Sequence, residues 1–485
     1  MEHKVFLVGA GPGEAGLLTC RGRAVLERAH TVIYDALVGP EVLALIPETA
    51  RAINVGKRAG HHSMTQEEIN RLLIQEARRD GPVARLKGGD PFLFGRGGEE
   101  ALALKEAGIP YEVVPGVSSA LAVPACCGIP VSQRGMASSV HIVTGHSREG
   151  TAPDIPYEAL AHAGGTLVFL MGLGAVEELS RGLLKAGMDP ETPAAVLQQG
   201  ATAGQKTFLG TLKTIPQLAS RARAPALFLV GSVCGLAPKL SWKENLPLFG
   251  CRIAVTRPRG RGDTLVSRLR ELGAEVPELP ATAISPLEWT LPEGPFTWVV
   301  FTSPRAVAFF REAMRKAHRD LRALAGVKIA AVGPGTAAAL EDWGLFCDLI
   351  PRQTDSQGLL DALAPLLTPR DRVLLPRAKA GDKVLPEGLA ATGARVEERF
   401  LYDTAARGPG AVPLEGLTAA ILTSPSAARG FLTWGVPEDT LLLCMGQPTA
   451  RAVRELGRQP LVAEAPTEEA LVRLALRSCS RHLFG

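Results

Sequence analysis

Glycines and an acidic side chain near the start of the chain have the spacing of a nucleotide-binding turn. Residues 5–19 read VFLVGAGPGEAGLLT, a strand-like run that carries the G-x-G-x-x-G pattern, and Asp35 ends the next apolar run. In a dinucleotide site such glycines let the backbone approach a pyrophosphate at a helix N-terminus, and the acidic residue binds a ribose hydroxyl. Pro12 lies inside the pattern and removes one N–H group that would contact the phosphates. The segment therefore predicts a strand, a tight turn and a helix, and leaves the ligand open.

A second glycine-rich segment, residues 85–100, is too specialised for an ordinary dinucleotide fold. It reads RLKGGDPFLFGRGGEE, with two glycines and Asp90 at the end of a predicted strand and a Gly-Arg-Gly-Gly turn behind them. Glycines at a strand end let the backbone approach a ligand, and Asp90 can accept hydrogen bonds from it. Arg96 projects from the second turn, where a guanidinium can pair with carboxylates. An NAD-dependent dehydrogenase is therefore disfavoured.

Composition sets the broad class of the protein. The chain has 485 residues, enough for about three domains, with 46% apolar and 5% aromatic residues and a net charge of +4. This balance gives an aliphatic core and argues against a nucleic-acid partner. The eight cysteines form no C-x-x-C pair or His/Cys ligand spacing, so neither a metal site nor a disulfide framework is expected. The chain opens without a signal peptide and has no apolar run long enough to span a bilayer, which predicts a soluble cytoplasmic protein without a membrane partner.

Strand-like and helical stretches alternate along the whole chain, which is typical of an α/β fold. Residues 235–250 interrupt the alternation with prolines and polar residues, and a new strand-like run, CRIAVTRP, follows. We place the main boundary there. The sequence predicts a first domain over 1–240, a linker over 241–249 and a second domain over 250–485.

A weak internal duplication in the second half predicts two similar lobes. Two pairs of segments resemble each other: residues 252–258 and 372–378, and residues 300–310 and 421–431. Given their order along the chain, the simplest packing makes lobe one discontinuous, with 250–283 and 408–485, and inserts lobe two, 284–403. Two extended segments would join the lobes, and a ligand cleft is expected between them.

The motifs of the first half resemble those of the tetrapyrrole methylases. LVGAGPG, YDALV, GKRAGHHSMTQEEIN, RLKGGDPFLFGRGGEE, VPGVSSALAVPA, GIPV and LMG occur in order within residues 1–240. The resemblance is strongest to uroporphyrinogen-III C-methyltransferases, and it implies that the glycine turns bind S-adenosyl-L-methionine and not NAD. It also implies a fold of two subdomains and a homodimer formed through this half.

Positions that match the family's motifs carry the roles that the resemblance implies. The proton acceptor falls on Asp35 and the proton donor on Lys57. The cofactor contacts fall on Pro12, Gly88, Gly89, Asp90, Leu93, Ser118, Ser119, Met171 and Gly200. Since the implied substrate carries many carboxylates, basic residues near predicted strand ends and loops are candidate partners: Lys57, Arg58, His61, His62, Arg85, Lys87, Arg96, Arg134 and His146. Of these, Arg96 is predicted to act in the reaction and Arg58 and Arg134 to bind substrate, with solvated surface charges as the alternative.

Small polar turns follow several predicted strands of the second half and could hold an anion with many carboxylates. The candidate residues in these turns are Arg257, Ser303, Gly335, Thr336, Ser424 and Thr449, and ordinary turn and helix-capping chemistry is the alternative for each. The segments VTRP, FTSPRAV, AVGPGTAAAL, TSPSAARGF and APTEEALV resemble uroporphyrinogen-III synthases over residues 250–485. That resemblance implies cyclisation of hydroxymethylbilane, with Tyr402 assisting the leaving hydroxyl. A half-buried structural tyrosine is the competing interpretation.

Together the two resemblances predict a bifunctional enzyme of tetrapyrrole biosynthesis. It would cyclise hydroxymethylbilane to uroporphyrinogen III and methylate that product twice to precorrin-2, a precursor of sirohaem and cobalamin. Three alternatives stay open from the sequence. These are a methylase of a related corrinoid, an NAD dehydrogenase, and a second half that binds a tetrapyrrole without catalysis and regulates the first.

Overall fold

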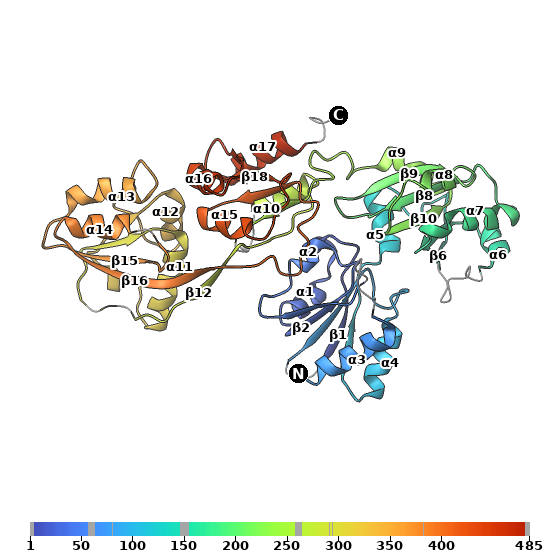
Figure 1. The fold of residues 1–485 in the computed structure, drawn as a ribbon, viewed down its shortest axis with the longest axis horizontal. Coiled ribbons are helices and arrows are strands. Elements are labelled where there is room, and N and C mark those ends of the chain that lie inside the picture. Colours follow the sequence, from blue (N-terminus) through green and yellow to red (C-terminus); the bar gives the residue numbers. More distant parts are fainter. Residues whose placement is uncertain are drawn as a thin grey trace. The chain divides into compact units, whose positions relative to one another are not determined.

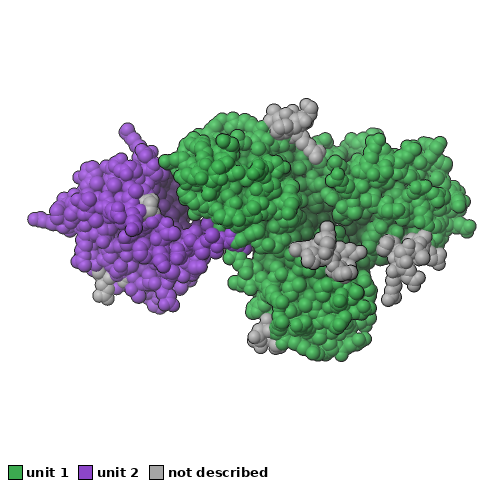
Figure 2. Space-filling view, viewed as in Figure 1, with its two compact units in different colours: residues 1–281, 408–485 green, residues 282–407 purple. Residues whose placement is uncertain are grey.

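The computed structural model describes residues 4–480 except for 57–63, 80, 146–154, 258–263, 291, 293 and 382. The chain forms two compact units (Figure 2). Unit 1 contains residues 1–281 and 408–485, and unit 2 contains residues 282–407. Among the described residues, every helix is too short or too polar to traverse a bilayer.

The first part of unit 1 is a parallel five-stranded sheet in the order β3-β2-β4-β1-β5 (Figure 1). Its strands are β1 (Val5–Gly9), β2 (Thr31–Tyr34), β3 (Arg51–Asn54), β4 (Val83–Lys87) and β5 (Tyr111–Val114). Its helices are α1 (Cys20–Leu26), α2 (Pro40–Leu43), α3 (Gln66–Ala77) and α4 (Gly97–Glu106), of which α3 and α4 lie side by side. The three central strands are buried along their length, which explains the apolar sequences of β1 and β2, whereas β4 carries the buried charges of Arg85 and Lys87.

The second part of unit 1 is a mixed sheet in the order β6-β7-β10-β8-β9. Its strands are β6 (Val140–Thr144), β7 (Thr166–Leu170), β8 (Pro193–Gln198), β9 (Lys206–Thr211) and β10 (Ala226–Val230). Its helices are α5 (Ser119–Cys126), α6 (Tyr157–His162), α7 (Val176–Lys185) and α8 (Ile215–Ala219), and the short α9 (Ala237–Leu240) follows. The predicted division of the first half into two subdomains is confirmed.

The third part of unit 1 is the predicted lobe one. Its strands are β11 (Ile253–Val255), β17 (Ala419–Leu422), β18 (Leu441–Cys444) and β19 (Pro460–Val462), all parallel. Its helices are α10 (Thr264–Glu271), α15 (Pro425–Leu432), α16 (Gln447–Glu455) and α17 (Glu468–Cys479). Ile253 pairs in register with Ala419, so a strand from before the insertion lies beside one from after it. The discontinuity of lobe one is confirmed.

Unit 2 is a five-stranded sheet in the order β12-β16-β15-β13-β14. Its strands are β12 (Thr282–Pro286), β13 (Trp298–Phe301), β14 (Lys328–Ala331), β15 (Arg372–Ala378) and β16 (Arg395–Ala406). Its helices are α11 (Pro304–Lys316), α12 (Pro334–Glu341), α13 (Ser356–Leu363) and α14 (Val384–Ala391). The first and last strands of the unit pair antiparallel, so the chain enters and leaves it side by side. The succession β13, α11, β14, α12 repeats in lobe one as β17, α15, β18, α16, which accounts for the internal duplication of the sequence.

Candidate active sites

The predicted cofactor residues follow strands of both sheets in the first half. Pro12 follows β1; Gly88, Gly89, Asp90 and Leu93 follow β4; Ser118 and Ser119 begin α5; Met171 follows β7; and Gly200 follows β8. Two backbone hydrogen bonds tie the first two turns together. The Gly11 N–H donates to the Gly89 carbonyl at 3.2 Å, and the Gly89 N–H donates to the Gly11 carbonyl at 2.8 Å. Two turns that lie 78 positions apart in the chain, at residues 11 and 89, therefore form one structure.

Gly89 leaves room for a ligand in front of helix α5. Its φ of +67° is one that side-chain-bearing residues rarely adopt, so glycine is favoured there. A Cβ added to Gly89 would lie 3.6 Å from the Ser119 nitrogen, and Ser118 is the N-cap of the same helix. The missing side chain therefore opens space at backbone N–H groups. This geometry fits a polar group of the expected cofactor.

Asp90 holds two of these turns in place. One carboxylate oxygen, Oδ1, accepts hydrogen bonds from the N–H groups of Phe92 (2.8 Å) and Leu93 (3.2 Å). The other oxygen, Oδ2, accepts from the Gly116 N–H at 3.0 Å, behind strand β5. Its hydrogen bonds within the chain therefore all go to backbone groups. The role that the structure displays for Asp90 is to shape the turns that the cofactor would contact.

The turn after β8 lies in the same region. Met171, in the turn after β7, has a φ of +57° and is about half exposed. A Cβ on Gly200 would overlap Val123 of α5, so this turn packs closely on the helix. A Cβ on Gly13 would lie 2.8 Å from the Thr202 methyl carbon, so the first glycine turn also contacts the turn after β8. The structure thus brings together predicted cofactor residues from both subdomains.

Asp35 lies directly behind strand β2, a quarter exposed. Its Oδ1 accepts from the Leu37 N–H at 3.0 Å, and its Oδ2 lies 3.9 Å from a guanidinium nitrogen of Arg85. Both the predicted proton donor Lys57 and the predicted substrate ligand Arg58 lie outside the described residues, as do His61, His62 and His146.

A buried carboxylate that sequence reasoning missed, Glu100 of α4, organises the charges behind Asp35. Its side chain is fully buried, and Oε1 accepts from Arg85 Nε (3.1 Å), Lys87 Nζ (2.9 Å) and Gln66 Nε2 (3.4 Å). With the partly exposed Asp35, two carboxylates lie beside two cations, so the charges of this cluster balance. The sequence does carry a hint of this buried carboxylate. GGEE places two glutamates next to each other at the start of a helix, and a helix can direct only one of them toward the sheet.

Arg85 and Lys87 differ from expectation. Both lie within strand β4, only 3% and 4% exposed, and not in a loop free to meet substrate carboxylates. Burial lowers the pKa of Lys87, the neighbouring Arg85 lowers it further, and Glu100 opposes both effects. Their physical role is to neutralise Glu100 in the interior, which leaves Arg85 facing Asp35.

Arg96 and Arg134 are both at the surface. Arg96 precedes α4 with a φ of +57°, and its guanidinium binds both oxygens of Glu99 at 2.8 Å. This hydrogen bonding raises the pKa of Arg96. Arg134 is exposed on the turn closed by pairing of Gln133 with Ala137. Neither residue contacts the Glu100 cluster through a bond that the structure displays.

The polar residues predicted in the second half occupy equivalent places in the two lobes. Ser303 and Ser424 are the N-caps of α11 and α15, and their hydroxyls accept N–H groups at 3.1 and 3.2 Å. Thr336 and Thr449 are the third residues of α12 and α16, and each is 3% exposed. Gly335 precedes Thr336 in the first turn of α12, with no neighbour within 4 Å of where its Cβ would be.

Tyr402 lies in strand β16 with its ring buried against Phe309, at a centroid distance of 5.2 Å. Its hydroxyl is 3.1 Å from the Ser303 hydroxyl, so two predicted residues of unit 2 are hydrogen-bonded. In unit 1, Arg257 follows β11 and donates to Glu468 at 2.7 Å. The structure therefore joins Tyr402 with Ser303, and places Arg257 in lobe one with Ser424 and Thr449.

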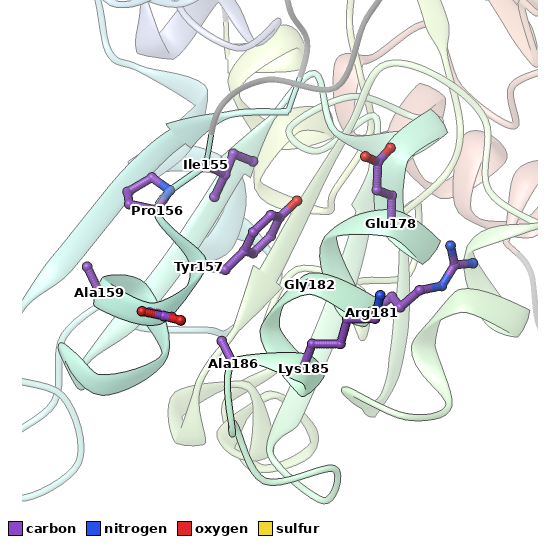
Figure 3. Close-up of a pocket in the computed structure, with 10 residues that line it drawn as sticks. Ile155, Pro156, Tyr157, Ala159, Glu178, Arg181, Gly182, Lys185 and Ala186 are labelled. Carbon is purple, nitrogen blue, oxygen red and sulfur yellow. The ribbon is translucent and has the colours of Figure 1, made fainter.

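A separate hollow lies between α6 and α7 in the second subdomain (Figure 3). Tyr157 points across Gly182, where an added Cβ would overlap the ring, and Glu178, Arg181 and Lys185 line the rim. Burial raises the pKa of Tyr157. None of the lining residues belongs to the predicted sites.

Comparison with known proteins decides the family. The family model of Tetrapyrrole (Corrin/Porphyrin) Methylases matches residues 4–216, and that of Uroporphyrinogen-III synthase HemD matches residues 263–473. A "Porphyrin biosynthesis protein HemD" of Ruminiclostridium josui is 38% identical, with 97% of each chain covered. This chain belongs to the HemD porphyrin biosynthesis family. The predicted pair of enzymes, an S-adenosyl-L-methionine-dependent tetrapyrrole methylase and a uroporphyrinogen-III synthase, is confirmed.

Two further relatives match the methylase half of this HemD-family chain. A "Siroheme synthase" of Edwardsiella ictaluri is 49% identical over 239 residues, and the chain spans about half of its length, 51%. The crystal structure of a uroporphyrin-III C-methyl transferase from Thermus thermophilus with S-adenyl homocysteine is 41% identical. It covers 47% of this chain and 98% of its own, with a TM-score of 0.42.

Proposed function

We propose that this chain carries out two consecutive steps of tetrapyrrole synthesis. The second half would cyclise hydroxymethylbilane to uroporphyrinogen III, and the first half would methylate that product twice to precorrin-2. The observation that carries the proposal is that the two glycine turns of the first subdomain, tied by the Gly11 and Gly89 backbone bonds, lie beside Ser119 and Thr202 of the second subdomain. The likeness to a siroheme synthase over the methylase half supports precorrin-2 as the product.

In the methylase half, alignment is the main requirement of the chemistry. Bound S-adenosyl-L-methionine supplies a sulfonium methyl group to a nucleophilic ring carbon, in a displacement whose rate depends on geometry. The glycine turns and Asp90 hold the cofactor contacts in one arrangement. Asp35 then takes the proton that leaves the alkylated ring. Arg85, itself bound by Glu100, lies beside the Asp35 carboxylate and helps to position it. Lys57 is the proposed proton donor.

In the synthase half, the reaction needs loss of a hydroxyl and control of conformation. The Tyr402 hydroxyl, bonded to Ser303, is the proposed aid to the leaving group. Hydroxyls and N–H groups at the first turns of α11, α12, α15 and α16 would bind carboxylates of the substrate. Arg257 adds a cation to the same set, and Arg58, Arg96 and Arg134 would serve the substrate of the methylase half.

We also propose the domain division 1–240, 241–249 and 250–485, with lobe two over 284–403, and a homodimer formed through the methylase half. Light scattering of the full chain as it leaves a size-exclusion column would measure its molecular mass, and twice the mass of one chain is expected. A monomeric mass at micromolar concentration would contradict the dimer.

The deciding experiment is an anaerobic incubation of the full chain with hydroxymethylbilane and S-adenosyl-L-methionine, followed by mass spectrometry of the tetrapyrrole. A cyclised type III product with two added methyl groups is expected. A type I ring, methylated or not, would mean that closure was spontaneous and that the second half only binds tetrapyrroles. A product without added methyl groups from supplied uroporphyrinogen III would contradict the proposed methylase substrate.

A further inference from the structure

Glu41, on helix α2 of the methylase half, is a buried carboxylate that accepts hydrogen bonds from two separate parts of the chain. Glu41 has a side chain that is 1% exposed. Its Oε2 accepts from the Ala15 N–H at 2.9 Å, within the first glycine-rich turn. Its Oε1 accepts from the Val276 N–H at 2.5 Å and from Arg270 Nε at 3.2 Å, both in lobe one of the synthase half. One carboxylate therefore links the turn that contains Pro12 to a segment more than 220 positions away.

Two more charged contacts reach the same turns. Lys243, in the predicted linker, pairs with Glu14 at 2.6 Å, also within the first glycine-rich turn. Glu275 of lobe one accepts the Ala203 N–H at 2.6 Å, in the turn after β8 that contains Gly200. Both turns that lobe one and the linker contact thus carry predicted cofactor residues.

An apolar core continues across this contact. One cluster of buried side chains includes Val38, Leu43 and Leu45 of the methylase half together with Leu279 and Phe431 of lobe one. A buried carboxylate is costly unless charges and N–H groups compensate it, and here lobe one supplies both an arginine and a backbone N–H. Burial raises the pKa of Glu41, while Arg270 and the two N–H groups counteract that effect. The contact between the methylase half and lobe one therefore depends on complementary groups: the Glu41 carboxylate on one side, and the Arg270 guanidinium and the Val276 N–H on the other.

We propose that Arg270, Glu275 and Lys243, which lie outside the methylase domain, are positioning residues for its cofactor turns. Lobe one then acts as a structural part of the methylase site, in addition to its own role in ring closure. This inference rests on the proposed binding of S-adenosyl-L-methionine at those turns. None of the three residues contacts the reacting atoms; each acts by fixing a backbone segment.

The test compares two substitutions on helix α10 of the full-length chain. Arg270→Met removes the cation from Glu41, whereas Arg268→Met removes an exposed cation that pairs with Glu271 on its own helix. Titration with S-adenosylhomocysteine by calorimetry should show a dissociation constant about tenfold higher for R270M, which corresponds to about 1.4 kcal/mol. R268M should match the wild type within about twofold.

Steady-state kinetics separates positioning from loss of folded protein. In R270M the KM for S-adenosyl-L-methionine should rise about tenfold while kcat changes little, because bound cofactor restores the turn. Arg270→Lys should recover part of the affinity. Ring closure by R270M should stay at the wild-type rate, which shows that lobe one is folded. If R270M does not fold, Lys243→Met tests the same turn from the linker, and unchanged S-adenosylhomocysteine affinity there would overturn the inference.

The outcomes also distinguish this inference from the proposed function. A wild-type chain that fails to bind S-adenosylhomocysteine would contradict the methylase proposal itself. A wild-type chain that binds it, with R270M binding equally well, would contradict only the positioning role of lobe one.

Discussion

The two halves build their candidate sites from different materials. The methylase half uses glycine turns joined by backbone bonds, and charges buried behind them around Glu100. The synthase half uses hydroxyls at helix N-termini and one bonded pair, Tyr402 with Ser303. Methyl transfer depends on alignment, which rigid turns supply, whereas closing a long flexible chain depends on holding many carboxylates at once. Single substitutions should therefore cost more in the first half than in the second.

The largest effect is expected from Asp90→Ala. It removes the acceptor of three backbone N–H groups, each a charge-assisted bond of about 1.5–3 kcal/mol, so the turns behind β4 and β5 should separate. S-adenosylhomocysteine affinity, measured by calorimetry, should fall at least about 100-fold, while ring closure continues.

Two matched variants define this prediction. Asp90→Asn keeps one acceptor oxygen and should give an intermediate affinity. Asp189→Ala removes an exposed aspartate that accepts a single N–H group elsewhere in the first half, and should leave the affinity unchanged. If D90A lost both methylation and ring closure, the contrast between the methylase and synthase halves would fail, because a substitution in one half would then disable the other.

The next effect concerns the charges behind Asp35. Glu100→Gln removes the buried carboxylate that binds Arg85 and Lys87 and leaves the partly exposed Asp35 beside them, which should destabilise the chain by about 3 kcal/mol and change the position of Arg85 relative to Asp35. Methylation of supplied uroporphyrinogen III should slow about 30-fold or more, mainly in kcat. Glu106→Gln, at the exposed end of the same helix, is the control. Equal rates for the two variants would remove Glu100 from the site.

A smaller effect is expected from Tyr402→Phe. The buried ring is retained and only the hydroxyl bonded to Ser303 is lost, so ring closure should slow about tenfold. The rate is measured from the loss of hydroxymethylbilane, with Tyr157→Phe in the methylase half as the control. Methylation should be unaffected, and an unchanged closure rate would leave Tyr402 as a structural residue.

The smallest effects come from the two equivalent helix caps, and they sharpen the comparison within the synthase half. Ser303→Ala and Ser424→Ala each lose one cap hydrogen bond and should reduce stability by about 1 kcal/mol in urea unfolding. Ser303→Ala should also slow ring closure, because Ser303 is the cap serine that is hydrogen-bonded to Tyr402. If both variants close the ring equally slowly, the hydroxyls act on substrate and not through Tyr402.

The sequence by itself determined the strands, the turns and the repeat, because these depend on local patterns. Glycine is strongly favoured at position 89 with its φ of +67°, and the apolar run of β1 is buried along its whole length. The discontinuous lobe one followed from the order of the duplicated segments and is borne out by the pairing of β11 with β17. Motifs alone led to the roles of Asp35 and Tyr402, which stay predictions.

Only the tertiary structure decided which charged groups meet. Nothing local separates Glu99, which reaches outward to Arg96, from Glu100, which is buried against Arg85; the packing of α4 on the sheet makes that choice. Glu41 and Arg270 are 229 positions apart, and neither position has a pattern that indicates its partner. The physical reason is that a buried charge is stable only beside its compensating groups. Those groups come from whichever elements the fold packs against it.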